Sequence, residues 1–421
     1  MRWRGPWLAA GVALGLAVLL AALVAWLNVR GEEAIADREL VLAPALVERG
    51  AYLARVGNCA ACHTDRGGAP FAGGKGIATP FGTVFASNIT PDAETGIGRW
   101  NAAEFWRAMH HGRSRDGRLL YPAFPYPDYT LVTREDSDAL FAYLRSVTAV
   151  RQANRVHELR FPYNLQASLA VWRALFFAPA RFEPEPGKPP EWNRGAYLAR
   201  GLGHCQACHA PRNAFGATNS DLELSGGLIP MQGWYAPSLA SPKEAGVQGW
   251  RVEEVVALLK AGESPRGAAM GPMAEVVFRS TQYFSDADLR ALATFLKDIP
   301  EHAPPAARPL EMPADVIALG RRLYGTHCAD CHGREGDGGG SAYPALAGHR
   351  TVTMASPANL VKVTIHGGFP PTTAANPRPY GMPPFGQALT DPEIAAIASF
   401  VRGAWGNAAP GVTALDVQRL R

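Results

Sequence analysis

One long apolar stretch stands near the start of the chain, and shorter amphipathic segments follow it. From Trp7 to Leu27 no residue carries a charge. At ~1.5 Å per residue, a helix over this stretch would be about 31 Å long, enough to cross the hydrocarbon layer of a membrane. Trp7 and Trp26 lie at its two ends, where aromatic side chains gather at membrane interfaces. The pattern predicts a membrane helix within residues 1–30.

The residues that flank this stretch predict its orientation. Arg2 and Arg4 precede it, which favours a cytoplasmic N-terminus and an exported remainder. The alternative is a cleaved signal peptide, with the small residues Ala34-Ile35-Ala36 as the cleavage site. However, the run is longer than a typical signal core of ~7–15 residues, and charged residues separate it from that site. We favour a retained anchor, and both alternatives export the body of the chain.

Three amphipathic helices with one capping pattern are predicted at wide intervals. Each begins after a hydroxyl residue that is followed three positions later by an acid, and apolar residues then recur at helical spacing. An aromatic residue occupies the same place in each helix. The capping residues are Thr133, Ser285 and Thr390, and the aromatic residues are Tyr143, Phe295 and Phe400.

These helices close the copies of a longer internal repeat. The sequence RGAYLAR at 49–55 returns unchanged at 194–200, and 318–324 is a looser third copy. Proline-rich stretches at 184–190 and 300–313 separate the repeats and predict semi-stiff spacers. We predict domains at 45–150, 192–300 and 314–407, with a connector at 151–191 and a linker at 301–313.

The connector contains an aromatic segment, 161–182, with Trp172, Phe176 and Phe177. One interpretation is a helix that packs two domains together. The other is a surface patch for a membrane or a partner protein.

A cysteine motif lies near the start of each repeat, and the three motifs contain every cysteine of the chain. The pattern C-x-x-C-H occurs at 59–63, 205–209 and 328–332. It is the signature of covalent c-type haem attachment: two thiols join one porphyrin, and the histidine supplies the proximal nitrogen to iron. A structural zinc site usually needs four ligands, often from two neighbouring pairs, and a redox dithiol needs no adjacent histidine. We predict three covalent haem c groups, held by Cys59, Cys62, Cys205, Cys208, Cys328 and Cys331, with His63, His209 and His332 as iron ligands.

Composition narrows the range of functions. A chain of 421 residues suggests about three domains. Its net charge of +4 is small and its basic residues are dispersed, so nothing favours nucleic acid. No nucleophile–base pair, phosphate loop or flavin motif is present, and the glycine run at 336–340 reads as a loop over a haem edge. The predicted chemistry is one-electron transfer.

The order of helix, C-x-x-C-H, long loop and closing helix resembles a class I cytochrome c domain. The exported region as a whole resembles the three-haem cytochrome c subunit of membrane-bound periplasmic dehydrogenases. That group serves alcohol, gluconate, sorbitol and fructose dehydrogenases, and molybdenum hydroxylases of aldehydes or N-heteroaromatics such as nicotinate. The resemblance implies a mainly α fold: three tandem class I cytochrome c domains behind one N-terminal transmembrane helix. The matching stretches are 120–126, 192–198, 201–205, 210–213, 271–273, 280–283 and 405–407.

The resemblance also implies a place in a complex of the respiratory chain. The chain would relay electrons from a catalytic dehydrogenase subunit, of the molybdenum hydroxylase, pyrroloquinoline quinone or flavin type, with or without a small additional subunit. The acceptor would be ubiquinone, a downstream cytochrome or a terminal oxidase. The chain would lie on the periplasmic side of the bacterial inner membrane and would not itself be the catalytic subunit. A cytochrome that serves an oxidase without any dehydrogenase is the alternative.

Methionines are the expected sixth iron ligands of two haems, since a thioether opposite histidine raises the haem potential. Met273, in Gly-Pro-Met, is predicted for the second haem, with Met270 as the runner-up. Met382, between glycine and proline in a loop, is predicted for the third.

The first repeat departs from the family pattern. Alcohol and gluconate dehydrogenase subunits resemble LYPAMPY here, whereas this chain has Phe124 in place of that methionine. The first haem therefore has an open site, or takes Met109, His110 or His111 from the preceding helix. The form with phenylalanine resembles cytochromes that pair with molybdenum hydroxylases. An open iron would also permit ligand or peroxide chemistry, which is a second functional hypothesis.

Overall fold

The computed structural model describes residues 5–32, 40–218, 222–302, 310–339 and 342–421. The arginines at 2 and 4, the predicted cleavage site at 34–36 and the centre of the linker at 301–313 lie outside the described residues. Contacts divide the chain into two units. The first comprises Met1–Leu53 and Cys62–Glu183, and the second comprises Ala54–Ala61 and Pro184–Arg421.

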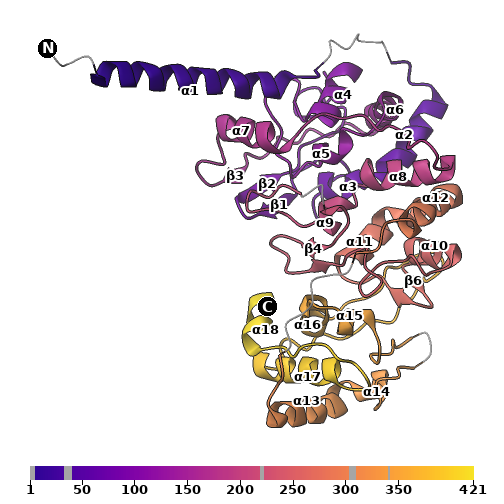
Figure 1. Ribbon diagram of the computed structural model, residues 1–421. Coiled ribbons are helices and arrows are strands. Elements are labelled where there is room, and N and C mark those ends of the chain that lie inside the picture. The colour runs from indigo at the N-terminus through magenta and orange to yellow at the C-terminus, as the bar shows by residue number, and fades with distance from the viewer. Residues whose placement is uncertain (1–4, 33–39, 219–221, 303–309, 340–341) are drawn as a thin grey trace. The chain divides into compact units, whose positions relative to one another are not determined.

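The first unit consists of helices and one small antiparallel sheet, in the order β1-β2-β3 (Figure 1). Two of its helices, α2 and α3, also contribute residues to the second unit. The helices are α1 (Gly5–Val29), α2 (Pro44–Val56), α3 (Cys59–His63), α4 (Ala102–His111), α5 (Tyr126–Tyr129), α6 (Arg134–Ser146) and α7 (Gln166–Phe176). The strands are β1 (Gly76–Thr79), β2 (Gly82–Phe85) and β3 (Glu158–Leu159).

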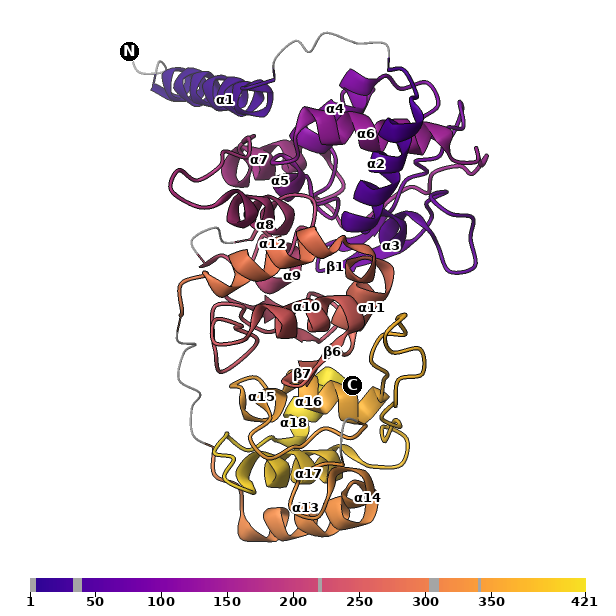
Figure 2. The ribbon, with the colours of Figure 1, turned by 90° about the vertical axis from the view of Figure 1, so that its right-hand side faces the viewer.

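The second unit contains the second and third predicted repeats, and its strands are short two-residue pairs (Figure 2). Its longer helices are α8 (Pro190–Arg200), α10 (Val252–Ala261), α11 (Pro272–Arg279), α12 (Asp286–Lys297), α13 (Ala314–His327), α16 (Ala358–His366) and α17 (Asp391–Gly403). The shorter ones are α9 (Gln206–His209), η2 (Thr281–Tyr283), α14 (Ala329–His332), α15 (Arg350–Thr353) and α18 (Ala414–Leu420). The strand pairs are β4 (Gly227–Leu228) with β5 (Tyr235–Ala236), and β6 (Glu263–Ser264) with β7 (Gly267–Ala268).

The three predicted helix starts are confirmed. The side chains of Thr133 and Ser285 accept a hydrogen bond from the backbone N–H three residues on. Thr390 and Glu393 form a reciprocal capping box at the start of α17. Such caps satisfy backbone donors that the first helical turn leaves without partners.

The same helix crossing occurs three times, where α2 meets α6, α8 meets α12 and α13 meets α17. A glycine of the first helix faces a backbone carbonyl of the second at each crossing, so closely that a Cβ would overlap the carbonyl oxygen. The aromatic residue of the closing helix packs beside that glycine. The glycines are Gly50, Gly195 and Gly320, and they face Ala139, Ala291 and Ala396.

A basic residue near the end of each closing helix donates hydrogen bonds to backbone carbonyls from an earlier segment of the same repeat. Arg145 donates to the carbonyl of Gly98, and Lys297 donates to that of Gln248 at 3.0 Å. Arg402 donates to the carbonyls of Val352 and Met354 at 2.8 and 3.1 Å. Burial lowers the pKa of Arg402 to about 10, so its guanidinium remains charged at neutral pH.

The apolar helix α1 is long and apolar enough to span a membrane from Trp7 to Val29. Its side chains are largely exposed, with Trp7 at 77% and Trp26 at 58%. A helix with these properties near the N-terminus is also compatible with a signal sequence.

Candidate haem sites

Each C-x-x-C-H motif forms a single helical turn. The motifs occupy α3, the turn that leads into α9 and the turn that leads into α14. In the second motif the backbone N–H of His209 donates to the carbonyl of Cys205 at 2.9 Å, and His332 pairs with Cys328 at 3.0 Å. Residues three apart on a helix share a face. Each motif therefore presents two thiols on one side, the first half-buried and the second exposed.

Each motif histidine is oriented by a backbone carbonyl. The Nδ1 atom of His63 lies 2.7 Å from the oxygen of Ser87, and that of His209 lies 2.7 Å from the oxygen of Pro237. His332 makes the same contact with Pro344 at 2.9 Å. Because a carbonyl only accepts, Nδ1 is the donating nitrogen, and in the neutral ring Nε2 then keeps its lone pair.

This donor set fits a covalently bound haem. A metal-ligating histidine almost always donates its other ring N–H to a carbonyl, carboxylate or water, which fixes the ring for the metal. Burial lowers the pKa of His63 and His209, outweighing the carbonyl hydrogen bonds that raise it. Both rings are therefore neutral at neutral pH, as a metal ligand must be. Among the described residues, no group of three or more His, Cys, Asp or Glu side chains is placed to hold a metal ion.

The three orienting carbonyls were not predicted from the sequence. Ser87, Pro237 and Pro344 lie 24, 28 and 12 residues after their histidines, so no constant spacing identifies them. They act through backbone oxygen, which every residue type carries.

Met273 lies at the start of α11, directly after a turn whose backbone conformation requires glycine at position 271. Gly271 has φ +55°, and a Cβ there would lie 2.9 Å from ring atoms of Trp234. Pro272 then begins the helix, with Met273 half-buried as its second residue. The local structure of this loop is therefore tightly determined.

Met382 lies in a loop that pairs with another loop of the third repeat. Its N–H donates to the carbonyl of Gly368 at 2.8 Å, and the N–H of Gly368 returns a bond at 3.0 Å. Met270, the runner-up for the second haem, points toward this pair: its Cε lies 3.4 Å from where a Cβ on Gly368 would be. Met270 therefore packs against the third repeat, which favours Met273 as the ligand.

Phe124 is half-buried and packs edge-on against Tyr129, with 5.4 Å between ring centroids. The candidate replacements on α4 are all buried, at 5% exposure for Met109 and His110 and 4% for His111. His110 stacks on Trp106 at 4.4 Å. These contacts favour packing roles, and the sixth ligand of the first haem stays a prediction.

His111 lies in a basic environment at the end of α4. Burial lowers its pKa to about 4, and the charges of His110, Arg173, Arg113 and Arg107 act in the same direction. Its ring is therefore neutral at neutral pH.

The second and third repeats are joined by polar contacts within the second unit. The side chain of Asn359 pairs with the backbone of Tyr235, accepting at 2.9 Å and donating at 2.7 Å. Arg350 donates to the carbonyl of Gly246 at 2.8 Å and lies over the ring of Trp250 at 5.3 Å. These contacts set the spacing between the second and third motifs.

The chain is similar to known proteins over most of its length. The family model for cytochrome c matches residues 47–148 and 317–405. The cytochrome c subunit of alcohol dehydrogenase (quinone) from Gluconacetobacter polyoxogenes is 41% identical over 395 residues, covering 90% of this chain and 84% of that protein. The gluconate 2-dehydrogenase cytochrome c subunit of Pantoea cypripedii is 38% identical, covering 90% of each chain. A nicotinate dehydrogenase subunit from Pseudomonas putida is 41% identical over 85% of this chain, which is 30% of that longer protein.

Proposed function

Because the chain belongs to the family of cytochrome c subunits of dehydrogenase complexes, we propose that it carries electrons away from a catalytic dehydrogenase subunit through three covalent haems. One observation carries this proposal: three motif histidines, far apart in the chain, are each oriented through Nδ1 by a backbone carbonyl. That arrangement leaves three Nε2 atoms available to iron. A redox dithiol would not require such a histidine.

The proposed architecture is three tandem class I cytochrome c domains, at 45–150, 192–300 and 314–407. The family model matches ranges within the first and third. The threefold glycine crossing supports the same assignment for the second, because α8 and α12 meet as the other two helix pairs do.

The cysteine pairs would hold each haem by thioethers, and the histidine would bind iron on one face. Haem supplies a one-electron couple at each site. Met273 and Met382 are the proposed ligands on the opposite faces of the second and third sites. The first site has Phe124 where such a methionine is expected, so the three potentials should differ and give the relay a direction.

The proposed location is the periplasmic side of the bacterial inner membrane, with α1 as a retained anchor. The acceptor is ubiquinone, a downstream cytochrome or a terminal oxidase. Two of the relatives are named as subunits of alcohol dehydrogenase (quinone) and of nicotinate dehydrogenase. The proposed catalytic partner is a molybdenum hydroxylase, a pyrroloquinoline quinone enzyme or a flavin enzyme, with or without a small additional subunit.

The first test is purification from native membranes in mild detergent. We expect three haems per chain, by pyridine haemochrome assay, and a copurifying dehydrogenase. Molybdenum in that partner would agree with the resemblance of the Phe124 segment to cytochromes that pair with molybdenum hydroxylases. Pyrroloquinoline quinone or flavin would contradict the partner inferred from that resemblance. Copurification with an oxidase alone would overturn the dehydrogenase proposal, and fewer than three haems would contradict the cofactor assignment.

Phe124 predicts an open iron at the first site. The reduced protein is expected to bind carbon monoxide at one of its haems, because phenylalanine offers no lone pair to iron. Phe124→Met should abolish that binding, and the matched control Phe124→Leu should retain it. A wild-type protein that binds no carbon monoxide would show that a side chain such as His110 closes the site.

A further inference from the structure

An uncharged, exposed surface lies beside the end of the apolar helix α1. It comprises one face of α7 and the turn before it, and we call it the α7 outer face. Its large members are Phe161, Leu165, Val171 and Leu175, exposed at 79%, 43%, 47% and 68%. Large apolar side chains gathered in this way on a protein surface usually mark an interaction site.

The opposite side of α7 is firmly attached to the first unit. Gln166 makes two hydrogen bonds with the backbone of Leu119, at 2.8 and 3.2 Å. Arg173 is 2% exposed and lies over the rings of Tyr126 and Phe177, at 5.0 and 4.8 Å. The outer face is therefore held outward by specific contacts of the inner face. Phe177, which the sequence grouped with the aromatic segment, belongs to the buried side at 6% exposure.

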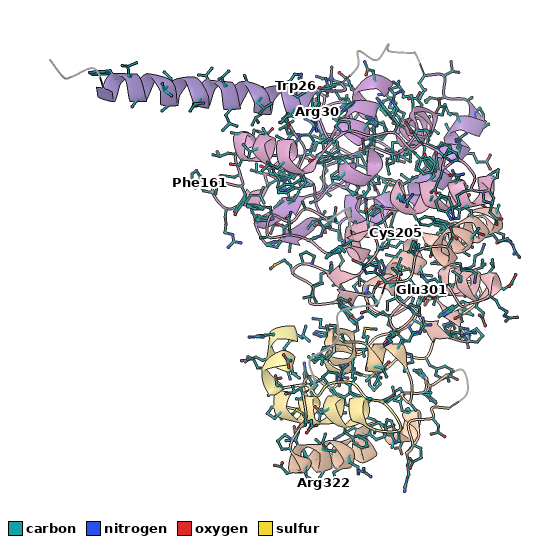
Figure 3. The ribbon with its side chains drawn as sticks, viewed as in Figure 1. Trp26, Arg30, Phe161, Cys205, Glu301 and Arg322 are labelled. Carbon is teal, nitrogen blue, oxygen red and sulfur yellow. The ribbon has the colours of Figure 1, made fainter. Side chains whose placement is uncertain are left out.

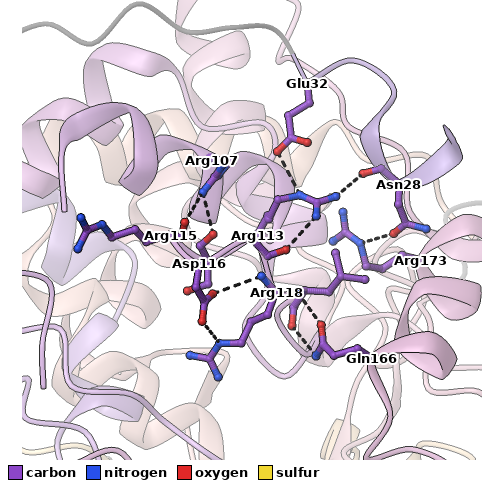
Figure 4. A network of polar contacts seen from close by, with 12 residues as sticks. Asn28, Glu32, Arg107, Arg113, Arg115, Asp116, Arg118, Gln166 and Arg173 are labelled. Atoms are coloured by element: carbon purple, nitrogen blue, oxygen red, sulfur yellow. Dashed lines mark hydrogen bonds and ion pairs between the residues drawn. The ribbon is translucent and has the colours of Figure 1, made fainter. Parts of the chain in front are cut away.

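The end of α1 is bonded directly to α7. The side-chain amide of Asn28 donates to the carbonyl of Ala170 at 2.9 Å and accepts from Nε of Arg173 at 2.9 Å. Arg113 donates to the carbonyl of Asn28 and lies 3.2 Å from a carboxylate oxygen of Glu32. Figure 4 shows Asn28 linked to both arginines. These bonds hold α7 next to the last turn of α1. In any bilayer that α1 spans, α7 would therefore lie near the membrane surface.

The α7 outer face lies on the side of the first unit toward which α1 extends. In Figure 3, Phe161 projects at the edge of the unit toward which α1 extends, and Trp26 marks the end of α1. Tryptophan is typical of the membrane–water boundary. A membrane that contains α1 up to Trp26 would therefore reach the turn at Phe161.

The charge pattern of the α7 outer face is compatible with a lipid environment. From 161 to 180 the sequence contains one charged residue, the buried Arg173. Exposed charges of both signs appear at its borders, with Arg155, Arg160 and Arg181 beside Glu158, Glu183 and Glu185. An apolar helical face without exposed charge, bordered by charged residues, matches the boundary between acyl chains and headgroups.

We propose that the α7 outer face inserts into the headgroup–acyl boundary of the bilayer that holds α1. This rests on the proposed anchoring function of α1. Attachment at two places would fix the orientation of the first haem site relative to the membrane more firmly than α1 and its contacts with α7 alone.

Photolabelling from within the bilayer tests the proposal. The purified holoprotein would be reconstituted into phosphatidylethanolamine–phosphatidylglycerol vesicles that contain a phospholipid with a photoreactive acyl chain. After illumination, labelled peptides would be identified by mass spectrometry. We expect label in α1 and in the 161–176 peptide, but not around Leu228 or Leu415, which are exposed at 61% and 52%.

Charged variants of the α7 outer face sharpen the test. Val171→Glu and Leu175→Glu should reduce label in 161–176 at least fivefold and leave label in α1 unchanged, while Leu228→Glu should change neither. Label in α1 without label in 161–176 would overturn this inference and leave the anchor in place. Absence of label from α1 would instead refute the anchor. Label in 161–176 that appears only after a copurified subunit is removed would assign the surface to that protein and overturn the proposal.

Discussion

Replacing Gly320 by alanine is expected to destabilise the α13–α17 pair by about 3 kcal/mol, at the upper end of overpacking costs. The matched change Gly325→Ala, on the same helix, is expected to stabilise it by roughly 0.5–1 kcal/mol. The two substitutions add the same methyl group to one helix, yet their effects should have opposite signs.

The difference arises from what each new methyl group would meet. A Cβ on Gly320 would overlap the carbonyl oxygen of Ala396 and lie 2.9 Å from the Cβ of Phe400. Those atoms belong to the interior of α17, so the helices must separate, and the contact between the rings of Tyr324 and Phe400 would loosen. Gly325 has no heavy atom within 4 Å of such a Cβ. There alanine only reduces the freedom of the unfolded chain.

Native-state hydrogen exchange of peptides from α13 and α17 is the suitable measurement, because a chain of several domains need not unfold in one step. Exchange in α6 and α12 is the internal reference and should not change. Equal protection in Gly320→Ala and the parent protein would show that the crossing is looser than described.

The crossing could be predicted from the sequence in part. The repeated RGAYLAR sequence and the position of Tyr143, Phe295 and Phe400 indicated that equivalent helices recur, and periodicity located their starts. Each crossing requires a glycine because a backbone carbonyl of another helix, far along the chain, lies against it. The periodicity of apolar residues gives no information about such a distant contact. The short strands β1 to β3 were not predicted for a related reason: such short segments have too few residues to show an alternating pattern.

At the haem sites too, the sequence predicts the features formed by neighbouring residues but not the contacts made by residues far along the chain. Each C-x-x-C-H motif is local, and its helical turn follows from the sequence. The partners of His63, His209 and His332 are backbone oxygens brought in by loops. Similarly, Arg173 gave no sign in the sequence that it would be buried. Its partners, Asn28 and Tyr126, come from other elements of the first unit.

Met273→Leu is expected to lower one of the three midpoint potentials by on the order of a tenth of a volt or more, since a lost thioether removes the ligand that raises the potential. It should also open a second iron, so that the reduced protein binds one more carbon monoxide than the parent protein. Met270→Leu, the same chemical change three residues earlier, should alter neither quantity.

The local structure explains why these two methionines should differ. Gly271 at φ +55° beneath the ring of Trp234, followed by Pro272, determines the path of the backbone into Met273. Met270 instead reaches toward Gly368, which pairs with Met382. Leucine nearly conserves the volume of methionine, so packing at either position should change by less than about 1.5 kcal/mol.

Potentiometric titration and carbon monoxide stoichiometry of the two variants decide the assignment together. A fall in potential with Met270→Leu, and none with Met273→Leu, would exchange the roles of the two residues. If both variants kept all three potentials, neither methionine would bind iron, and the second site would be open like the first. A change in the third potential with Met270→Leu would show that the contact at Gly368 controls the Met382 loop, and that the second and third sites are coupled through it.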